Sequence, residues 1–259
     1  MGMDIVIMKD PLASRISPDV GKPTASKQGL RKKRLEDQIV NDEHLVVLLS
    51  GGLDSSLVIG WYINERGYKP INIHPLFVNY DQAWFLDERE AALEVCRYYN
   101  TSPLRSVDRY LGVGGSIREY DVNRRLKGYI PLRNIHLFNL AADYVIELQL
   151  AGLDCPCFAS GSRFSAYPDT TQEFFDRYNF MLDVSVWERL SAENPFAWWG
   201  TKRIYGYAKK IKFPLDISSS CQDKQAGFSQ EGRVACGKCN KCRERATHGY
   251  TLDLIKATS

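Results

Sequence analysis

The sequence predicts an α/β protein, with a parallel sheet that has helices on both faces and a small metal-binding segment at the C-terminus. Short apolar runs of strand length alternate with segments of helical periodicity from residue 45 onward. The first run ends in a glycine-rich turn that opens a helix, and four cysteines gather near the C-terminus. We therefore divide the chain into a mobile lead-in over 1–44, an α/β domain over 45–217, and a C-terminal segment over 218–259 that packs on the same domain.

Length and composition limit the class of protein. The chain has 259 residues, of which 44% are apolar and 25% charged, and this suits a globular protein with a substantial core. Its net charge of +3 is too small to indicate nucleic acid. No apolar run reaches the roughly 18 residues of a membrane span, and no secretory signal is visible. We expect a cytoplasmic protein without a membrane or nucleic-acid partner.

The first apolar run leads into a loop suited to phosphate. Residues 45–49 predict a buried strand, 50–52 a tight turn, and 55–65 a helix that ends at Gly67 as its C-cap. Glycines let backbone N–H groups approach an anion, and the positive end of the helix favours phosphate. The loop matches neither the Walker A motif nor Gly-x-Gly-x-x-Gly. A plain strand–turn–helix junction with Asp54 as a capping group is the structural alternative.

Further strands and helices alternate along the chain. The predicted strands cover 71–78, 101–107 and 158–161, and the predicted helices cover 86–99, 135–150, 172–182 and 197–212. In the first of these helices, the buried side should carry Ala91, Ala92, Val95 and Cys96. Ligands of parallel sheets bind at the carboxyl ends of the strands, so the loops after Leu49 and Val78 should meet over one crevice. A strand at 4–8, a helix at 27–40 and an active-site loop at 109–130 complete the prediction.

The cysteines near the C-terminus have the spacing of metal ligands. Cys221 is followed by Cys236, Cys239 and Cys242, and two Cys-x-x-Cys steps share Cys239. Four thiolates satisfy tetrahedral Zn²⁺ at about 2.3 Å with no open position, so we expect a structural zinc site. Lysines and arginines between and after these cysteines would offset its negative charge. An iron–sulfur cluster accepts the same four ligands and is the alternative.

The loop and the cysteine cluster together resemble one enzyme family. Ser50-Gly-Gly-Leu-Asp-Ser-Ser56 is similar to the pyrophosphate-binding loop of the N-type ATP pyrophosphatases, which share the PP-loop or adenine nucleotide alpha hydrolase-like fold. Three further stretches, at 131–134, 166–169 and 220–243, occur in the order typical of 7-cyano-7-deazaguanine synthases of the queuosine pathway. The resemblance to this QueC-like family covers about residues 45–250.

The resemblance implies an activity, cofactors and partners. The family converts 7-carboxy-7-deazaguanine into 7-cyano-7-deazaguanine through adenylated carboxylate and amide intermediates, with ammonia as nitrogen donor. ATP, Mg²⁺ and Zn²⁺ are the cofactors that it implies, and a homodimer is the implied assembly. The expected nucleotide-binding residues are Leu49, Ser50, Gly51, Gly52, Leu53, Asp54, Ser55, Ser56, Phe77 and Tyr80.

Three residues are candidates for catalysis. Asp54 would position Mg²⁺ or the loop itself, Arg133 would neutralise the α-phosphate or the substrate carboxylate, and Asp169 would accept hydrogen bonds from the deazaguanine. Plain structural roles stay open for two of them, namely a surface ion pair for Arg133 and a turn carboxylate for Asp169. Core packing likewise accounts for Phe77 as well as stacking on adenine does.

The sequence departs from the family near the expected crevice. The family's Tyr-Gly-Gln-Arg-His reads Tyr-Asp-Gln-Ala-Trp at 80–84, and its Pro-Gly-Arg-Asn has Leu132 in place of glycine. Loss of the cation and the imidazole predicts that the reaction stops at an amide, formed with ammonia or another amine such as a protein amine. Replacement without consequence is the alternative. A diverged member of an antiphage system, an adenylating tRNA thiolase and a non-catalytic nucleotide-binding regulator also stay open.

Overall fold

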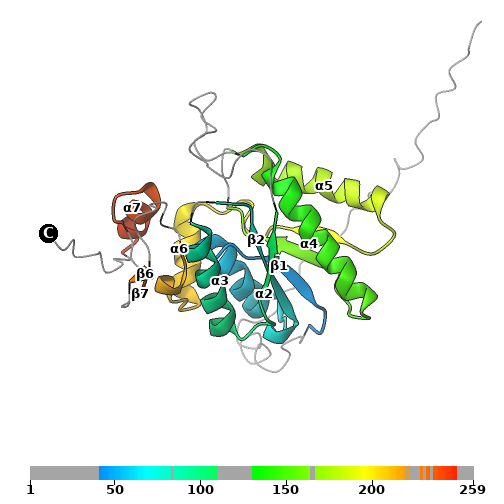
Figure 1. The fold of residues 1–259 in the computed structure, drawn as a ribbon, viewed down its shortest axis with the longest axis horizontal. Coiled ribbons are helices and arrows are strands. Elements are labelled where there is room, and N and C mark those ends of the chain that lie inside the picture. Colours follow the sequence, from blue (N-terminus) through cyan, green and yellow to red (C-terminus); the bar gives the residue numbers. More distant parts are fainter. Residues whose placement is uncertain are drawn as a thin grey trace, which may run out of the picture. The chain divides into compact units, whose positions relative to one another are not determined.

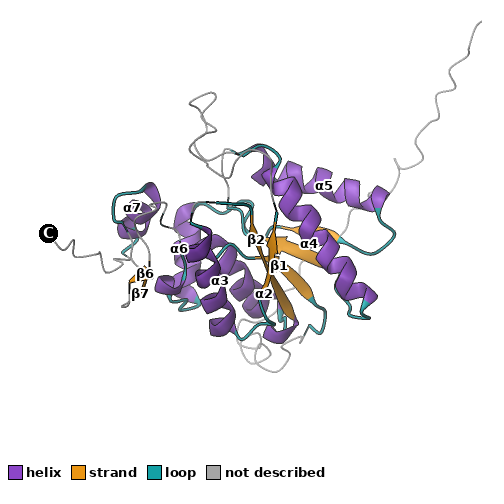
Figure 2. Ribbon diagram, viewed as in Figure 1, coloured by secondary structure: helices purple, strands orange, loops and turns teal. Residues whose placement is uncertain are grey.

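Five strands form one parallel sheet. In the computed structural model, the strands are β1 (Leu45–Leu48), β2 (Ile73–Asn79), β3 (Arg105–Asp108), β4 (Cys157–Ser160) and β5 (Ser191–Glu193). Their order is β3-β2-β1-β4-β5, and every pair is parallel. All four residues of the central strand β1 are buried, as expected for a strand covered on both faces. Figure 2 shows the strands between helices.

Helices cover both faces of this sheet. On one face lie α2 (Leu53–Arg66), α3 (Phe85–Tyr99) and α6 (Thr201–Lys210), and on the other lie α4 (Arg133–Leu150) and α5 (Gln172–Ser185) (Figure 1). Neighbouring residues of β1 point to opposite faces, so Val47 packs in the first core and Val46 in the second. The predicted fold class is therefore confirmed.

The structure describes residues 41–82, 84–109, 130–163, 167–219, 221, 228–229, 232–233 and 236–249. All of these residues belong to one compact unit of the chain. Among the described helices, none combines the length and apolar character that a membrane crossing requires. The strand predicted at 4–8, the helix at 27–40 and nearly all of the loop at 109–130 lie outside the described residues.

Most elements agree with the sequence pattern. The buried residues of α3 are the four that were predicted, and α2 ends at Gly67, which has the left-handed φ of 71° expected of its C-cap. Strand β5 was not predicted, because it is three residues long and buries only Ala192. The predicted helix at 197–212 was wrong at its start, since residues 195–198 form turns and α6 begins at Thr201 after Gly200.

The C-terminal segment is anchored to the sheet domain. It contains β6 (Phe228–Ser229), β7 (Gly232–Arg233) and α7 (Asn240–Thr247), and the short helix η3 (Leu215–Ile217) precedes it. Arg245 of α7 is buried, and its guanidinium donates to the carbonyl oxygens of Leu215 and Ser218 at 3.2 and 2.8 Å. The next residue, Ser219, donates its N–H to the carbonyl of Gly51 at 2.8 Å. The segment thereby reaches the loop after β1.

The strand order locates the place where a ligand should bind. From β1 the chain proceeds outward to β2 and β3, and it then crosses to the opposite side of β1 to form β4. The β1–β4 pair is therefore the topological switch point, and ligands of open parallel sheets bind outside the carboxyl ends of such strands.

Candidate active site

The loop after β1 requires glycine at its first turn position. Gly51 has a φ of 73°, in the left-handed region. A Cβ at this position would lie 2.2 Å from the carbonyl oxygen of Glu88 and 2.7 Å from the Cβ of Ala91, both on α3. The loop is thus pressed against the first turns of α3, and an L side chain is excluded both by backbone conformation and by space.

The hydroxyl groups of the loop bond to one another and leave the helix end uncapped. Ser50 and Ser55 share a hydrogen bond between their Oγ atoms at 3.0 Å, and the hydroxyls of Ser55 and Ser56 both donate to the carbonyl of Gly52. No side chain caps α2 at Gly52, so Asp54 does not serve as its cap. No side-chain oxygen therefore caps the N–H groups at the start of α2, which suits an anion, while Asp54 adds one negative charge in the first turn.

Two adjoining cavities open at the carboxyl ends of the strands. The larger one, of about 440 Å³, is lined by the ends of β1, β2 and β4 and by the first turns of α4. The smaller one, of about 230 Å³, is lined by the loop, by Asp54 and by residues of α7. Leu49 and Val78 both line the larger cavity, so the loops that follow them meet over one crevice as predicted. The residues shared by both cavities are Ser50, Ser55, Trp84, Glu88, Gly161 and Lys241.

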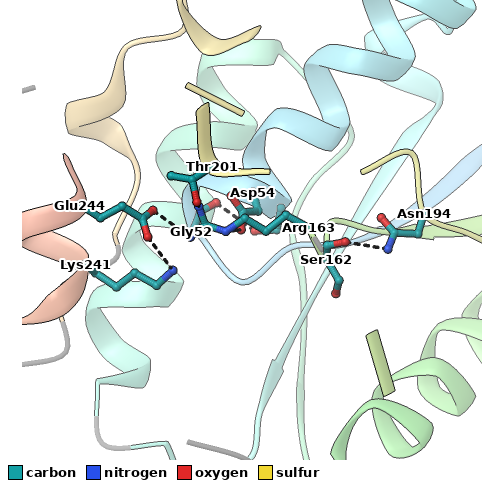
Figure 3. A network of polar contacts seen from close by, with 9 residues as sticks. Gly52, Asp54, Ser162, Arg163, Asn194, Thr201, Lys241 and Glu244 are labelled. Atoms are coloured by element: carbon teal, nitrogen blue, oxygen red, sulfur yellow. Dashed lines mark hydrogen bonds and ion pairs between the residues drawn. The ribbon is translucent and has the colours of Figure 1, made fainter. Parts of the chain in front are cut away.

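Arg163 connects three parts of the smaller cavity (Figure 3). Its Nε lies 3.2 Å from Oδ2 of Asp54, and a terminal nitrogen lies 2.8 Å from Oε1 of Glu244 in α7. Its other terminal nitrogen donates to the hydroxyl of Thr201 at 3.0 Å. Burial raises the pKa of Asp54, and the guanidinium of Arg163 opposes that rise. Arg163 thus joins α2, α6 and α7. The sequence interpretation did not select this residue.

Arg133 occupies the other end of the crevice. It is the first residue of α4 and lines the larger cavity, with its Nε donating to Asn134 Oδ1 at 3.3 Å. Burial raises the pKa values of Tyr80 and Asp169, and in both cases the charge of Arg133 opposes the rise. Arg133 therefore lies near both groups. This arrangement differs from the isolated surface ion pair that was its structural alternative.

Asp169 is buried with one oxygen unsatisfied. Only 7% of the residue is exposed, and Asn134 Nδ2 donates to its backbone carbonyl at 2.9 Å. Its Oδ2 has no hydrogen-bond partner among the described residues. Asn134, which contacts Asp169, lines the larger cavity, and so does Tyr167, which precedes Asp169 closely in the chain. A buried carboxylate oxygen without a partner is costly, and such a group commonly has a functional reason.

The predicted nucleotide-binding residues divide into two groups. Those that line one or both cavities are Leu49, Ser50, Gly52, Leu53, Asp54, Ser55 and Tyr80. Gly51 and Ser56 lie beneath them, packed on α3 and bonded to the loop respectively. Phe77 is 1% exposed in the core that faces α2 and α3, so core packing accounts for it and it is not on the crevice.

A glutamate stands where the two cavities join. Glu88 Oε1 accepts from Trp84 Nε1 at 2.9 Å, and its Oε2 accepts from Gln82 Nε2 at 3.0 Å. The same amide of Gln82 donates to the carbonyl of Val78, and its Oε1 accepts from the N–H of Tyr80 at 2.8 Å. Burial raises the pKa of Glu88 to about 7. Sequence reasoning did not select Glu88, because a lone glutamate in the first turn of a helix carries no distinct pattern.

The four cysteines meet as a metal site requires. The sulfurs of Cys221, Cys236, Cys239 and Cys242 all lie within 4.8 Å of one another, and those of Cys236 and Cys242 are 3.9 Å apart. A tetrahedron with metal–sulfur bonds of about 2.3 Å has sulfurs separated by about 3.8 Å. Backbone N–H groups donate to three of the sulfurs at 3.3–3.4 Å, as suits thiolates. The donor set fits a tetrahedral metal centre.

Comparison with known proteins identifies the family. The family model described as "Queuosine biosynthesis protein QueC" matches residues 44–252. The chain belongs to this family. The 7-cyano-7-deazaguanine synthase 1 of Desulfitobacterium hafniense is 29% identical over 212 residues, covering 78% of this chain and 89% of the relative. The 7-cyano-7-deazaguanine synthase of Methanopyrus kandleri is 29% identical over 213 residues, with coverages of 77% and 91%.

Among solved structures, a U34-tRNA thiolase from Methanococcus maripaludis with its [4Fe-4S] cluster aligns at 16% identity, covering 73% of this chain and 66% of that chain. The TM-score is 0.42, a likeness too low to inform the fold or the metal of this QueC family member.

In this QueC family member, two residues that replace a glycine of the resembled motifs keep the backbone that glycine favours. Leu132 has a φ of 62° immediately before α4, and Asp81 has a φ of 64° after β2. The N–H of Asp81 donates to Asn79 Oδ1, which supports the turn. Left-handed backbone costs a non-glycine residue about 1 kcal/mol or more, so the chain maintains these turns under strain. Ala83, another departure, lies outside the described residues.

Proposed function

We propose that this chain is an ATP-dependent ligase that adenylates the carboxylate of 7-carboxy-7-deazaguanine and replaces AMP by nitrogen, ending at 7-cyano-7-deazaguanine. The observation that carries the proposal is the crevice itself. A glycine loop with an uncapped helix end opens one cavity, and Arg133 lines the adjoining one, with Asp169 buried behind the lining residue Asn134. Membership of the QueC family and relatives named 7-cyano-7-deazaguanine synthase support the same activity.

The smaller cavity suits the phosphates of ATP. The backbone of 50–52 and the positive end of α2 would hold the pyrophosphate part. Lys241 lines both cavities, so its ammonium can contact the phosphate groups of ATP and also those of the products, AMP and pyrophosphate. Asp54 is 25% exposed and paired with Arg163, which fits a role in holding the loop helix against α7. Asp54 would be the carboxylate of the loop that helps to hold Mg²⁺, and the metal would neutralise phosphate charge.

The larger cavity suits the substrate and the α-phosphate. Arg133 presents a guanidinium that can bind a carboxylate or a phosphate with two parallel hydrogen bonds. The free Oδ2 of Asp169 can accept from the N–H groups of a guanine-like base, which present two adjacent donors. Tyr80 borders the same space. An acceptor carboxylate held between these groups would lie near the α-phosphorus of an ATP seated on the loop.

The chemistry follows from the leaving group. A carboxylate resists amidation because its oxygen is a poor leaving group. An oxygen of the substrate carboxylate therefore attacks the α-phosphorus of ATP, which gives an acyl adenylate and releases pyrophosphate. Ammonia then displaces AMP and gives an amide. A second adenylation, at the amide oxygen, allows loss of AMP to leave the nitrile. Arg133 and Lys241 are the cations placed to stabilise charge at phosphorus in each round.

The cysteine cluster would hold Zn²⁺ in a structural role. Four thiolates leave no open position for substrate, and the sulfur geometry fits the ion. Because Ser219 bonds to Gly51 and Arg163 bonds to Glu244, a folded cysteine segment supports the phosphate loop from behind. Zinc binding would therefore affect catalysis through the loop.

One alternative outcome has a specific observation in its favour. Trp84 occupies the crevice where the resembled motif has histidine, so the reaction would end at the amide, with ammonia or another amine such as a protein amine. An antiphage role would fit such a product. A thiolase is less well supported, since Cys96, Cys155 and Cys157 are all buried. A homodimer remains a prediction from the resemblance, and a cytoplasmic location remains a prediction from the sequence.

Mass spectrometry of the products tests the proposal. Purified protein is incubated with 7-carboxy-7-deazaguanine, ATP, Mg²⁺ and ammonia, and products are followed to completion. Nitrile as final product supports the synthase, and amide that persists with ATP in excess supports the alternative outcome. Absence of AMP and pyrophosphate formation with this acid would refute both. Replacing 7-carboxy-7-deazaguanine by benzoate is the control for substrate-independent ATP cleavage.

A further inference from the structure

We infer that Glu88 is the proton acceptor for the attacking amine, and that Trp84 and Gln82 position its carboxylate for this step. The inference rests on the proposed adenylation and names a catalytic residue within it.

Glu88 lies at the junction of the two cavities. It lines both the phosphate side and the substrate side of the crevice, together with Ser50 and Lys241. An acyl adenylate necessarily has its phosphate on one side and its acyl group on the other, so its acyl carbon belongs at this junction. The carbonyl of Glu88 also packs where a Cβ on Gly51 would be, which ties the first turns of α3 to the loop. A base here is within the region where nitrogen must approach carbon.

The carboxylate is held by two donors that do not titrate. Trp84 Nε1 and Gln82 Nε2 each donate to one oxygen, at 2.9 and 3.0 Å. Gln82 is itself only 2% exposed and fixed by bonds to the backbone at Val78 and Tyr80. Each carboxylate oxygen has two acceptor sites, so one site on each remains for a proton from the amine. The tryptophan at 84 thus takes part in the site as a donor to a base.

Burial, with smaller contributions from neighbouring groups, places the pKa of Glu88 near neutral pH. Burial raises its pKa to about 7, while the donors Gln82 and Trp84 and the charge of Arg133 oppose the rise and Asp87 adds to it. The remaining titratable groups that line the two cavities with Glu88 are Asp54, Tyr80, Arg163, Tyr167, Tyr205, Cys221, Lys241 and Glu244. A base with a pKa close to the working pH is both ionised and strong enough to accept a proton.

The step balances without any further reactant. The lone pair of the amine nitrogen forms a bond to the acyl carbon of the adenylate, and the bond from that carbon to the phosphate oxygen breaks. AMP leaves with the electron pair of that bond. The nitrogen loses one proton to the carboxylate of Glu88, which then releases it to water. No electron transfer occurs, and ATP has already supplied the activated acyl group.

Separate measurements of the two half-reactions test the inference. Adenylation is followed by pyrophosphate–ATP exchange with 7-carboxy-7-deazaguanine and no amine, and amine transfer by amide formed under single-turnover conditions. Total ammonia is adjusted at each pH so that the free base is constant. In the parent, we expect the transfer rate to fall as pH drops below about 7, where Glu88 holds its own proton. Glu88→Gln should keep exchange within about twofold, lower transfer by roughly 10² or more, and lose that fall.

Two further variants separate catalysis from structure. Trp84→Phe keeps an aromatic ring but removes one donor to the carboxylate, so the fall in transfer should move to higher pH while exchange is retained. Glu90→Gln, on the same helix, is the matched control and should leave both half-reactions and the pH profile unchanged. Transfer by Glu88→Gln at the parent rate, or equal loss of exchange and transfer, would overturn the role of Glu88. No exchange in the parent would instead refute the proposed function.

Discussion

The carboxyl of Glu88 should make the fold less stable as pH rises, and Glu88→Gln should remove this effect. Burial raises the pKa of Glu88 from 4.5 to about 7. Between these values, the folded protein holds a proton that the unfolded chain has lost. The free energy of unfolding is therefore highest where the carboxyl is protonated and falls as pH rises through about 7. Above neutral pH, the ionised Glu88 carboxylate in the cavity therefore lowers the free energy of unfolding.

The size of the effect follows from the same values. Linkage gives a loss of about 2–3 kcal/mol between pH 5 and pH 8 for a carboxyl whose pKa rises from 4.5 to about 7 on folding. Solvent at the cavity screens part of it, so we expect about 2 kcal/mol. Glutamine also leaves one of the donors Trp84 or Gln82 facing an amide N–H₂, which costs about 1–3 kcal/mol at any pH. That second cost is constant and cancels when one pH is compared with the other.

Urea unfolding of parent and Glu88→Gln at about pH 5 and pH 8 measures this double difference. Metal content is kept equal, so that titration of the cysteine segment cancels between the two proteins. Between the lower and the higher pH, the free energy of unfolding of the parent should fall by about 2 kcal/mol more than that of the variant. Glu90→Gln should gain nothing. If the difference between parent and Glu88→Gln were the same at both pH values, the burial argument for Glu88 would be refuted.

Three other predictions concern the loop and its support, and a substitution in α6 serves as a control. Cys239→Ser should reduce bound zinc from about one per chain and lower the Tm, as measured by elemental analysis and thermal unfolding, whereas stoichiometric iron in the parent would contradict the zinc assignment. Gly51→Ala should destabilise by about 2–5 kcal/mol, because left-handed strain adds to a clash with α3. Gly206→Ala, where a Cβ meets nothing within 4 Å, should instead stabilise α6 by up to about 1 kcal/mol. Arg163→Gln leaves Asp54 without its cation and should cost about 3 kcal/mol in urea unfolding; a neutral effect would show that the pair has no structural weight.

Features that depend on neighbouring residues were predictable from the sequence. The loop at 50–52 follows a buried strand and opens a helix, and its chemistry is set by glycines that are adjacent in the chain. The buried face of α3 follows from the 3.6-residue period. The cysteine cluster follows from two short spacings, with Cys221 brought in by the fold.

Features that depend on tertiary contacts were not predictable in the same way. Arg163 and Glu244 are 81 residues apart in number and meet only because β4 ends beside α7. Phe77 is a second example. An aromatic residue near the end of a strand can contact a ligand or pack in the core, and which of the two occurs depends on the face of the sheet to which it points. Strand β5 has too few residues to show a period.

The replaced histidine shows how a local reading of a motif can mislead about chemistry. From the sequence, tryptophan at 84 removes a titratable group, and this predicted a crevice less suited to moving protons. In the structure, the indole N–H is bonded to Glu88, a carboxyl whose pKa burial raises to about 7. The crevice therefore contains a group that titrates near neutral pH four residues further along the chain. The hypothesis that the reaction ends at an amide then depends on the space for the amine at Trp84 more than on a lost base. Single-turnover transfer rates with ammonia and with a bulkier primary amine distinguish these two causes. A base defect slows transfer to both amines alike, whereas a change in the shape of the crevice alters the ratio of the two rates.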